Sequence, residues 1–178
     1  MSLSRYQSSC GTDIMQINFT HIENCVWIQP QLHNDNRGVF CEIFKHSFLE
    51  KFIPAQSNYS FSKKGVLRGI HRTPYAKLVT CVKGSVYDVC VDLRPNSKTY
   101  NQYFSINLQD SLLNSLYIPP YCGHGFLATE DSILVYQQDQ EYKQQLDESY
   151  CWKQYNIQWP NTPLIISTKD IDSCNDTH

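Results

Sequence analysis

The feature that most constrains the fold of this chain is a succession of short runs rich in aromatic and β-branched residues, separated by turn residues. Such runs are typical of β-strands, because side chains branched at Cβ pack well on a pleated surface. Helical segments do not alternate with these runs, so the pattern predicts an all-β, antiparallel sandwich or barrel. The predicted strands lie within residues 24–31, 38–45, 57–63, 65–71, 77–84, 85–94, 100–109, 114–120, 124–129 and 133–142.

The length of 178 residues predicts one domain with a full hydrophobic core. We expect residues 1–15 to form a disordered extension and residues 16–178 to form the domain, with an irregular segment after Pro160. Lys83 and Gly84 separate two strong strands and predict a tight hairpin. Only residues 46–52, HSFLEKF, favour a short helix.

The charge and hydropathy of the chain exclude several classes of partner. The net charge is −2, and this offers no general electrostatic attraction to nucleic acid or to an anionic membrane surface. The longest apolar runs are far shorter than the roughly 18–20 residues of a membrane span. The polar N-terminus lacks the apolar core of a signal peptide. We therefore expect a cytoplasmic protein with no nucleic-acid or membrane partner.

The sequence contains eight cysteines, and their positions do not resemble a disulfide framework. No Cys-x-x-Cys motif is present, which argues against zinc-ribbon and thioredoxin-like sites. Four of the cysteines lie inside strand-like runs, where free thiols behave as small hydrophobic side chains. Reduced thiols are therefore the prediction, and these four are Cys25, Cys41, Cys81 and Cys90.

Basic side chains gather around one break between strands, in the stretch VLRGIHRTPYAKLV. His71 is a natural general base near neutral pH, with Arg68 before it and Lys77 after it. In a flat strand, Arg68 and His71 would point to opposite faces. Both can reach one pocket only if the strand twists or bulges at Gly69.

The run SVYDVCVDL alternates in a way that gives one aspartate an unusual place. Tyr87, Val89, Val91 and Leu93 share one core-like face, as expected for every second residue of a strand. The other face carries Asp88 between small residues. A carboxylate there either faces outward into water or has partners in a pocket, and the pattern leaves both open.

A metal site has little support in the sequence. The His-x-His pair common in β-barrel metal sites is missing, because Arg72 and Thr73 follow His71. His124 has no histidine two to four residues away, and nearby arginine and lysine side chains repel a cation. We therefore predict no metal and no cofactor.

The arginines at strand ends suit an anion instead. Arg37, Arg68 and Arg94 each border an apolar run, and guanidinium groups bind a diphosphate through paired hydrogen bonds. For Arg94 and Arg72, an ordinary surface position is the better interpretation. Tyr136 lies in an apolar strand as either a core tyrosine or a general acid, and its local sequence does not decide.

The motifs together resemble the dTDP-4-dehydrorhamnose 3,5-epimerase family from about Val26 to Asp170. They occur in the order DNRGVFCEIFK, QSNYSFSKKGVLRGIH, AKLVTCVKGSVYDVCVDLR, YIPPYCGHGF, LVY and STKD. The resemblance implies a metal-free cupin jelly roll, which is usually a homodimer with strands exchanged across the interface. It implies a nucleotide-diphospho-sugar substrate whose 4-keto group acidifies the hydrogens at carbons 3 and 5.

By matched position, the resemblance implies four catalytic residues. His71 would be the base, and Asp170 would orient it. Lys77 would stabilise the enolate oxygen, and Tyr136 would deliver a proton from the opposite face.

The same resemblance implies a set of substrate-binding residues. Arg68 and Arg37 would hold the diphosphate with His124 beside them, and the interior position of Asp88 favours the pocket interpretation. The family positions around nucleotide and sugar correspond to Glu42, Gln56 and Asn58.

The sequence departs from the family at Thr73, where a glutamine is usual, and in the segment after Tyr136, where Glu141 replaces an aromatic residue. These departures leave the nucleotide (dTDP or GDP) open, together with epimerisation at one or both carbons. Four other functions stay open: a carbon-3 epimerase, a 3,4-ketoisomerase, a non-catalytic sugar-nucleotide binding module and a metal-dependent oxygenase.

Overall fold

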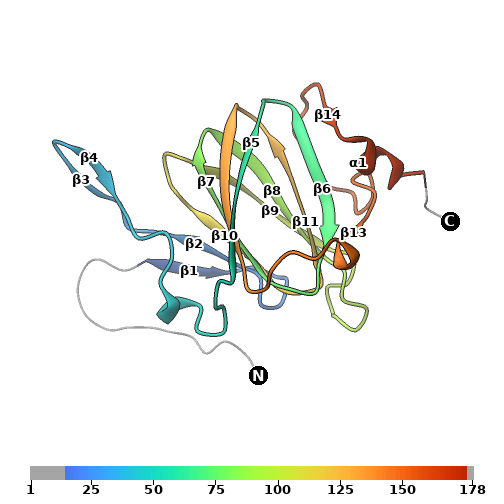
Figure 1. Cartoon of the computed structure of the whole chain (residues 1–178), viewed down its shortest axis with the longest axis horizontal. Helices are drawn as coiled ribbons and strands as arrows, with labels where there is room; N and C mark the ends of the chain where they lie inside the picture. The colour runs from blue at the N-terminus through green and yellow to red at the C-terminus, as the bar shows by residue number, and fades with distance from the viewer. Residues whose placement is uncertain (1–14, 176–178) are drawn as a thin grey trace.

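The computed structural model describes residues 15–175, and the predicted N-terminal extension lies outside them except for Met15. Two β-sheets face each other and form the barrel seen in Figure 1. The first sheet has the strand order β1-β2-β10-β7-β12-β5, and the second has the order β13-β6-β11-β8-β9. The described strand pairs are antiparallel except for β14 with β6, and this confirms the predicted all-β antiparallel jelly roll.

The strands of the first sheet are β1 (Gln16–Phe19), β2 (Val26–Gln29), β5 (Gln56–Ser62), β7 (Lys77–Lys83), β10 (Ser115–Ile118) and β12 (Ser132–Gln138). Those of the second are β6 (Val66–Arg72), β8 (Ser85–Asp92), β9 (Tyr103–Gln109), β11 (Cys122–Ala128), β13 (Glu148–Ser149) and β14 (Ile165–Ile166). A separate hairpin consists of β3 (His33–Asp35) and β4 (Gly38–Phe40). The helical turns are η1 (His46–Phe48), η2 (Gln144–Leu146) and α1 (Thr168–Asp172).

The main core fills the space between the sheets with every second residue of the central strands. Val79 and Cys81 of β7 contribute from the first sheet, and Val86 and Cys90 of β8 contribute from the second. Alternation of side chains along a strand produces this division, since residues i and i+2 share a face. A fully buried aliphatic side chain contributes about 1.5–3 kcal/mol, so this layer dominates the stability.

The outer faces of both sheets are also covered in part. Leu49 and Phe52 pack on the outer face of the first sheet, and the helix predicted over 46–52 is reduced to the single turn η1. The C-terminal segment packs Tyr155 and Trp159 against the outer face of the second sheet. That face is the core-like one predicted for β8, and the segment after Pro160 is largely irregular, as predicted, apart from β14 and α1.

The hairpin predicted at Lys83 and Gly84 is wrong. Strand β7 belongs to the first sheet and β8 to the second, so Gly84 is a corner between sheets. Gly84 has φ +72°, a left-handed conformation that glycine adopts at low cost. The Gly84 amide donates to the Asp110 carboxylate at 2.8 Å. A short connection that contains glycine therefore has the same sequence pattern whether it joins two paired strands or joins two different sheets.

The prediction of reduced thiols is wrong for one pair. Cys151 and Cys174 form a disulfide. The four cysteines within strand-like runs are free, and Cys25, Cys81 and Cys90 are buried as predicted. The disulfide joins the segment after β13 to the residues after α1, two regions that only the fold brings together.

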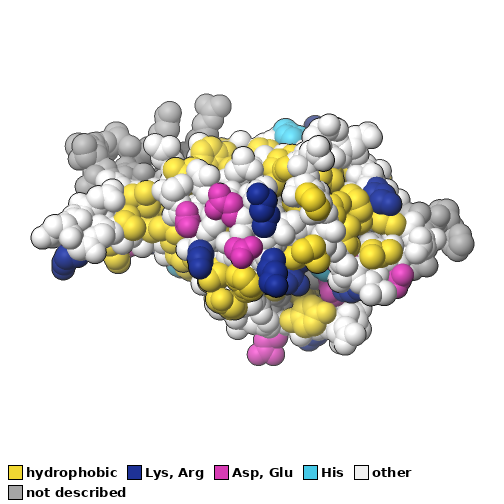
Figure 2. Space-filling view, turned by 90° about the horizontal axis from the view of Figure 1, so that it is seen from above, with side chains coloured by type: hydrophobic (Ala, Val, Ile, Leu, Met, Phe, Trp, Pro, Cys, Tyr) yellow, Lys and Arg dark blue, Asp and Glu magenta, His cyan; other side chains and the backbone are white. Residues whose placement is uncertain are grey.

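The β3–β4 hairpin projects away from the barrel as an arm (Figure 1). Val39 and Phe40 on this arm are exposed. On the face seen in Figure 2, Lys and Arg side chains lie among Asp and Glu side chains rather than in a patch of one sign. Within residues 15–175, the helices are too short and polar to cross a membrane.

Candidate active site

A bulge in β6 turns Arg68 and His71 to the same side of the sheet. His71 is paired with His124 and Arg68 with Phe126, so two residues of β6 lie opposite Gly125 alone. Directly opposed residues in antiparallel strands point to one face, and Phe126 belongs to the core between the sheets. The predicted break at Gly69 is therefore a bulge that faces both side chains inward.

Gly69 has the backbone geometry that this bulge requires. Its φ is +110°, and a Cβ built there would lie 2.5 Å from the His124 carbonyl oxygen. Residues with a side chain rarely adopt this φ, and the partner strand leaves no space for one. Glycine is thus required for both conformation and close approach.

His71 forms a tight pair with Asp170. The distance between His71 Nε2 and Asp170 Oδ1 is 2.7 Å, and the carboxylate is 3% exposed against 28% for the imidazole. Ser167 caps α1 and donates to the second carboxylate oxygen at 2.9 Å. Burial alone would raise the pKa of Asp170, but the hydrogen bonds from His71, Ser167 and the Gly69 amide outweigh it and lower the pKa.

The pairing of β14 with β6 explains how Asp170 reaches His71. Strand β14 pairs with Val66 and Leu67 at one end of β6, and α1 follows it directly. Strand β13 pairs with His71 and Arg72 at the other end. The C-terminal segment thus borders β6 on both sides of the bulge and places Asp170 beside His71.

A second His–Asp pair lies next to the first. His124 Nε2 is 2.9 Å from Asp88 Oδ2, and the Asp88 side chain is fully buried. Asp88 faces inward beside Cys90, which settles the pattern left open in the sequence in favour of an interior position. Burial raises the pKa of Asp88, although His124 and Lys77 act in the other direction.

Lys77 and Tyr136 face the histidines from the opposite sheet. Lys77 shares the inner face of β7 with Val79, and Val79 is paired with Tyr136 of β12. Burial lowers the pKa of Lys77 to about 8, an unusual value for an amine. Burial also raises the pKa of Tyr136, while the charge of Arg68 lowers it. His71 and His124 therefore line the space between the sheets on one side, and Lys77 and Tyr136 line it on the other.

Polar side chains of β5 line the same inner face. Gln56 donates to Asn58 at 2.6 Å, and Asn58 donates to Gln138 at 2.9 Å. Arg68 donates through Nε to Ser62 at 3.1 Å, which ties the guanidinium of β6 in the second sheet to β5 in the first. Four predicted residues therefore share the inner faces of the two sheets with His71: Gln56, Asn58, Arg68 and Tyr136.

Two predicted binding residues lie elsewhere within one chain. The Arg37 side chain is 86% exposed and pairs with Asp35 on the projecting arm. Glu42 follows the arm, is exposed and pairs with Lys45. This chain by itself does not bring Arg37 and Glu42 to the inner face that carries His71.

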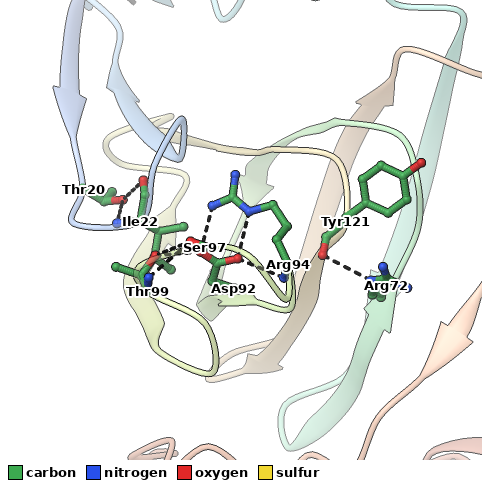
Figure 3. Close-up of polar contacts among 8 residues, drawn as sticks. All are labelled: Thr20, Ile22, Arg72, Asp92, Arg94, Ser97, Thr99 and Tyr121. Carbon is green, nitrogen blue, oxygen red and sulfur yellow. Dashed lines mark hydrogen bonds and ion pairs between the residues drawn. The ribbon is translucent and has the colours of Figure 1, made fainter. Parts of the chain in front are cut away.

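The two arginines assigned to surface positions have structural partners (Figure 3). Arg94 forms a two-pronged ion pair with the buried Asp92, at 2.8 Å for each nitrogen. Ser97 and Thr99 also donate to Asp92, so its pKa is strongly lowered despite its burial. Arg72 donates to the Tyr121 carbonyl and to Glu148. Both guanidiniums are thus engaged by groups of this chain.

Several residues of this region escaped the sequence analysis. Ser167 had a usable signal, because serine three residues before an acidic residue is typical of a helix N-cap. Ser62, Gln138 and Asp147 had none, since each acts through a partner that is distant in sequence. Among residues 15–175, no cluster of three or more His, Cys, Asp or Glu side chains is arranged to hold a metal ion.

Comparison with known proteins identifies the family. Residues 19–175 match the family model of dTDP-4-dehydrorhamnose 3,5-epimerase. The chain belongs to this family. The Shigella flexneri dTDP-4-dehydrorhamnose 3,5-epimerase is 36% identical over 170 residues, which span 89% of this chain and 94% of the relative. The family implied by the sequence motifs is thus confirmed.

Solved structures agree with this assignment. A Legionella pneumophila epimerase in complex with dTDP-4-keto-L-rhamnose aligns with a TM-score of 0.85 and 31% identity, over 89% of this chain and 91% of that one. A 3′-monoepimerase from Streptomyces bikiniensis in complex with dTDP-quinovose aligns with a TM-score of 0.81 and 31% identity, over 87% and 85%. The protein is an epimerase with the cupin-type jelly-roll fold.

Proposed function

We propose that this protein epimerises carbons 3 and 5 of a dTDP-linked 4-keto-6-deoxy sugar in deoxysugar biosynthesis. The observation that carries the proposal is the His71–Asp170 pair facing Lys77 and Tyr136 across the barrel. Relatives of the same family and fold include a structure that holds dTDP-4-keto-L-rhamnose, and this favours dTDP over GDP as the nucleotide.

In the proposed mechanism, His71 removes the hydrogen next to the 4-keto group. One ring nitrogen of His71 is engaged by Asp170, so the other has a lone pair free to accept the proton. The electrons of the C–H bond move to the keto oxygen and form an enolate. Asp170 stabilises the imidazolium that results, as an acidic partner does for a catalytic histidine.

Lys77 and Tyr136 complete the exchange from the other sheet. The Lys77 ammonium stabilises the negative enolate oxygen, and burial strengthens this interaction because water is excluded. Tyr136 donates a proton to the carbon from the face opposite His71, which inverts the configuration. A lysine pKa of about 8 keeps most of this side chain charged at neutral pH.

The remaining predicted residues would bind the nucleotide. Arg68, fixed by Ser62, is placed to hold the diphosphate at the mouth of the barrel. We propose that the buried Asp88 orients His124 beside it. Gln56 and Asn58 would contact the sugar or the nucleotide from β5.

A homodimer with exchanged strands would supply the missing residues. The arm exposes Val39 and Phe40, and the outer face of β5 exposes Tyr59, at 68%, and Phe61. Burying such side chains against a second copy is favourable by about 25 cal/mol per Å² of apolar surface. In the proposed dimer, the arm of one subunit carries Arg37 and Glu42 to the site of the other.

Solvent deuterium incorporation tests the reaction. Incubation with dTDP-4-keto-6-deoxyglucose in D₂O is expected to place deuterium at carbons 3 and 5, as followed by NMR and mass spectrometry. The relationship to a 3′-monoepimerase favours epimerisation at carbon 3 alone as the second candidate, with one deuterium. Binding without any incorporation would leave a sugar-nucleotide binding module, and substrate preference for the GDP sugar would reject the proposed nucleotide.

Mixing two inactive variants tests the exchanged dimer. Arg37→Ala and His71→Asn homodimers each lack a residue in both sites. Hybrid dimers formed from both chains would have one complete site if the arm serves the partner, and activity would return. Hybrids without recovered activity, or a monomer in analytical ultracentrifugation, would reject the exchange.

A further inference from the structure

The segment between β12 and β13 joins the two sheets next to the candidate active site. Strand β12 belongs to the first sheet and β13 to the second, so residues 139–147 run from the sheet that carries Tyr136 to the sheet that carries His71 (Figure 1). This is also the stretch where the sequence departs from its family. The segment carries Asp147, whose side chain is only 9% exposed.

Asp147 has one partner on α1 and one within its own segment. Its carboxylate accepts a hydrogen bond from Lys169 Nζ at 2.8 Å and another from the Tyr142 hydroxyl at 3.2 Å. Lys169 directly precedes Asp170 on α1, the helix that carries the partner of His71. One bond of Asp147 therefore fixes the helix behind the proposed base.

Tyr142 also contacts β5, a strand of the first sheet. The Tyr142 backbone amide donates to Gln56 Oε1 at 2.8 Å. Gln56 in turn donates to Asn58, and both are proposed substrate-binding residues. Tyr142 thus links Asp147 to Gln56, with its hydroxyl bonded to Asp147 and its backbone amide bonded to Gln56 on the inner face of β5.

We propose that Asp147 is a positioning residue for epimerisation, joining the helix of Asp170 to the substrate-binding strand β5. The inference rests on the proposed function and concerns how the site is held together. Asp147 does not contact the reacting carbons in this role. It acts through Lys169, Tyr142 and Gln56.

The charge of Asp147 also bears on Lys77. Burial is the main influence on Lys77 and lowers its pKa, whereas the charge of Asp147 raises it and that of Lys169 lowers it. Asp88 and Cys90 on β8 act on this pKa in the same direction as Asp147. The inner faces of the surrounding strands also carry Arg68 and His71 on β6, His124 on β11 and Tyr136 on β12, and Asp139 accepts a hydrogen bond from the Ala76 amide next to Lys77. Lys77 needs its proton to stabilise the enolate, so Asp147 widens the pH range in which the amine is charged.

The two partners of this ion pair are therefore expected to shift the pH profile in opposite directions. Asp147→Asn keeps the shape and removes the negative charge, so the basic limb of kcat/KM moves to lower pH, by about one unit for charges in a partly buried site. Lys169→Gln removes a positive charge, and the basic limb moves to higher pH. Both variants lose the hydrogen-bonded link between α1 and β5, and we expect KM to rise about 10-fold.

The experiment measures deuterium exchange over a range of pH for wild type and four variants. Asp172→Asn is the matched control, because it removes an exposed carboxylate from α1 without touching Asp147. Tyr142→Phe keeps both charges and removes one hydrogen bond, so KM should rise while the basic limb stays in place. It also keeps the test decisive if Asp147→Asn fails to fold.

The outcomes separate the inference from the function on which it rests. Opposite shifts for Asp147→Asn and Lys169→Gln, with Asp172→Asn unchanged, support the positioning role. Active wild type with the same basic limb and KM in all variants would overturn the inference and leave the function intact. No exchange by wild type would overturn both.

Discussion

Two His–Asp pairs lie on neighbouring strands of one sheet, and their carboxylates differ in origin and in environment. His71 of β6 and His124 of β11 are directly opposite in register. Asp170 comes from α1 at the C-terminal end and has a lowered pKa, whereas Asp88 lies in the middle of β8 and has a raised pKa. Both carboxylates are buried, so burial alone cannot account for the difference.

Hydrogen-bond donors explain the difference between the carboxylates. Asp170 accepts from His71, Ser167 and the Gly69 amide, and these donors favour its charged form. Asp88 has the His124 ring as its hydrogen-bond partner and is surrounded by the apolar core. In the proposed function, the first pair stabilises an imidazolium during turnover, and the second fixes the orientation of His124.

Replacing each histidine gives the largest expected contrast. His71→Asn should lower kcat about 1000-fold with dTDP binding retained, because a general base acts mainly in the transition state. His124→Asn should act mainly on KM, with kcat reduced less than 10-fold. Deuterium exchange and calorimetric dTDP titration measure the two effects. Equal losses of kcat in both variants would remove the distinction between the pairs.

Breaking the disulfide should affect the first pair alone. Cys151 and Cys174 close a loop of sequence separation 23 around α1, and loss of such a crosslink costs about 3 kcal/mol of unfolding free energy. Cys174→Ser should therefore lower the urea midpoint and reduce kcat, since Asp170 is held less firmly. Cys41→Ser, which alters a free thiol, is the control. Unchanged kcat in Cys174→Ser would show that α1 is fixed without the crosslink.

Neutralising each carboxylate should separate orientation from binding. Asp170→Asn is expected to reduce kcat about 100-fold, or about 2.7 kcal/mol, because the imidazolium loses its charged partner. Asp88→Asn should reduce kcat only a few-fold, since a neutral amide still bonds to His124. Steady-state kinetics with purified, folded variants provides the measurement, and a larger kcat loss in Asp88→Asn would reverse the proposed roles.

The acid stability of the same variants gives the smallest expected effect. The lowered pKa of Asp170 adds stability that is present above about pH 4 and is lost as pH falls further. The raised pKa of Asp88 works in reverse, so wild type gains stability relative to Asp88→Asn as pH falls toward about 4. Urea unfolding at pH 6, 4 and 3 measures both trends. A wild type that loses stability relative to Asp88→Asn as pH falls would contradict the prediction.

The sequence by itself determined the local features of this protein. Alternation in SVYDVCVDL identified both faces of β8, because the strand period follows from backbone geometry. Arg68 and His71 could reach one pocket only if the strand twisted or bulged at Gly69, and the structure has a bulge there. The ordered motifs identified the family over most of the chain, which the match over residues 19–175 confirms.

Only the tertiary structure decided which distant segments meet. His71 and Asp170 are 99 residues apart, and their contact depends on β14 pairing with β6. Gly84 lies at a corner between the two sheets, and Cys151 forms a disulfide with Cys174. Local sequence patterns do not encode either feature, because both depend on how the two sheets pack. Asp147 meets Lys169 of α1 for the same reason: the segment that carries Asp147 runs from the first sheet to the second.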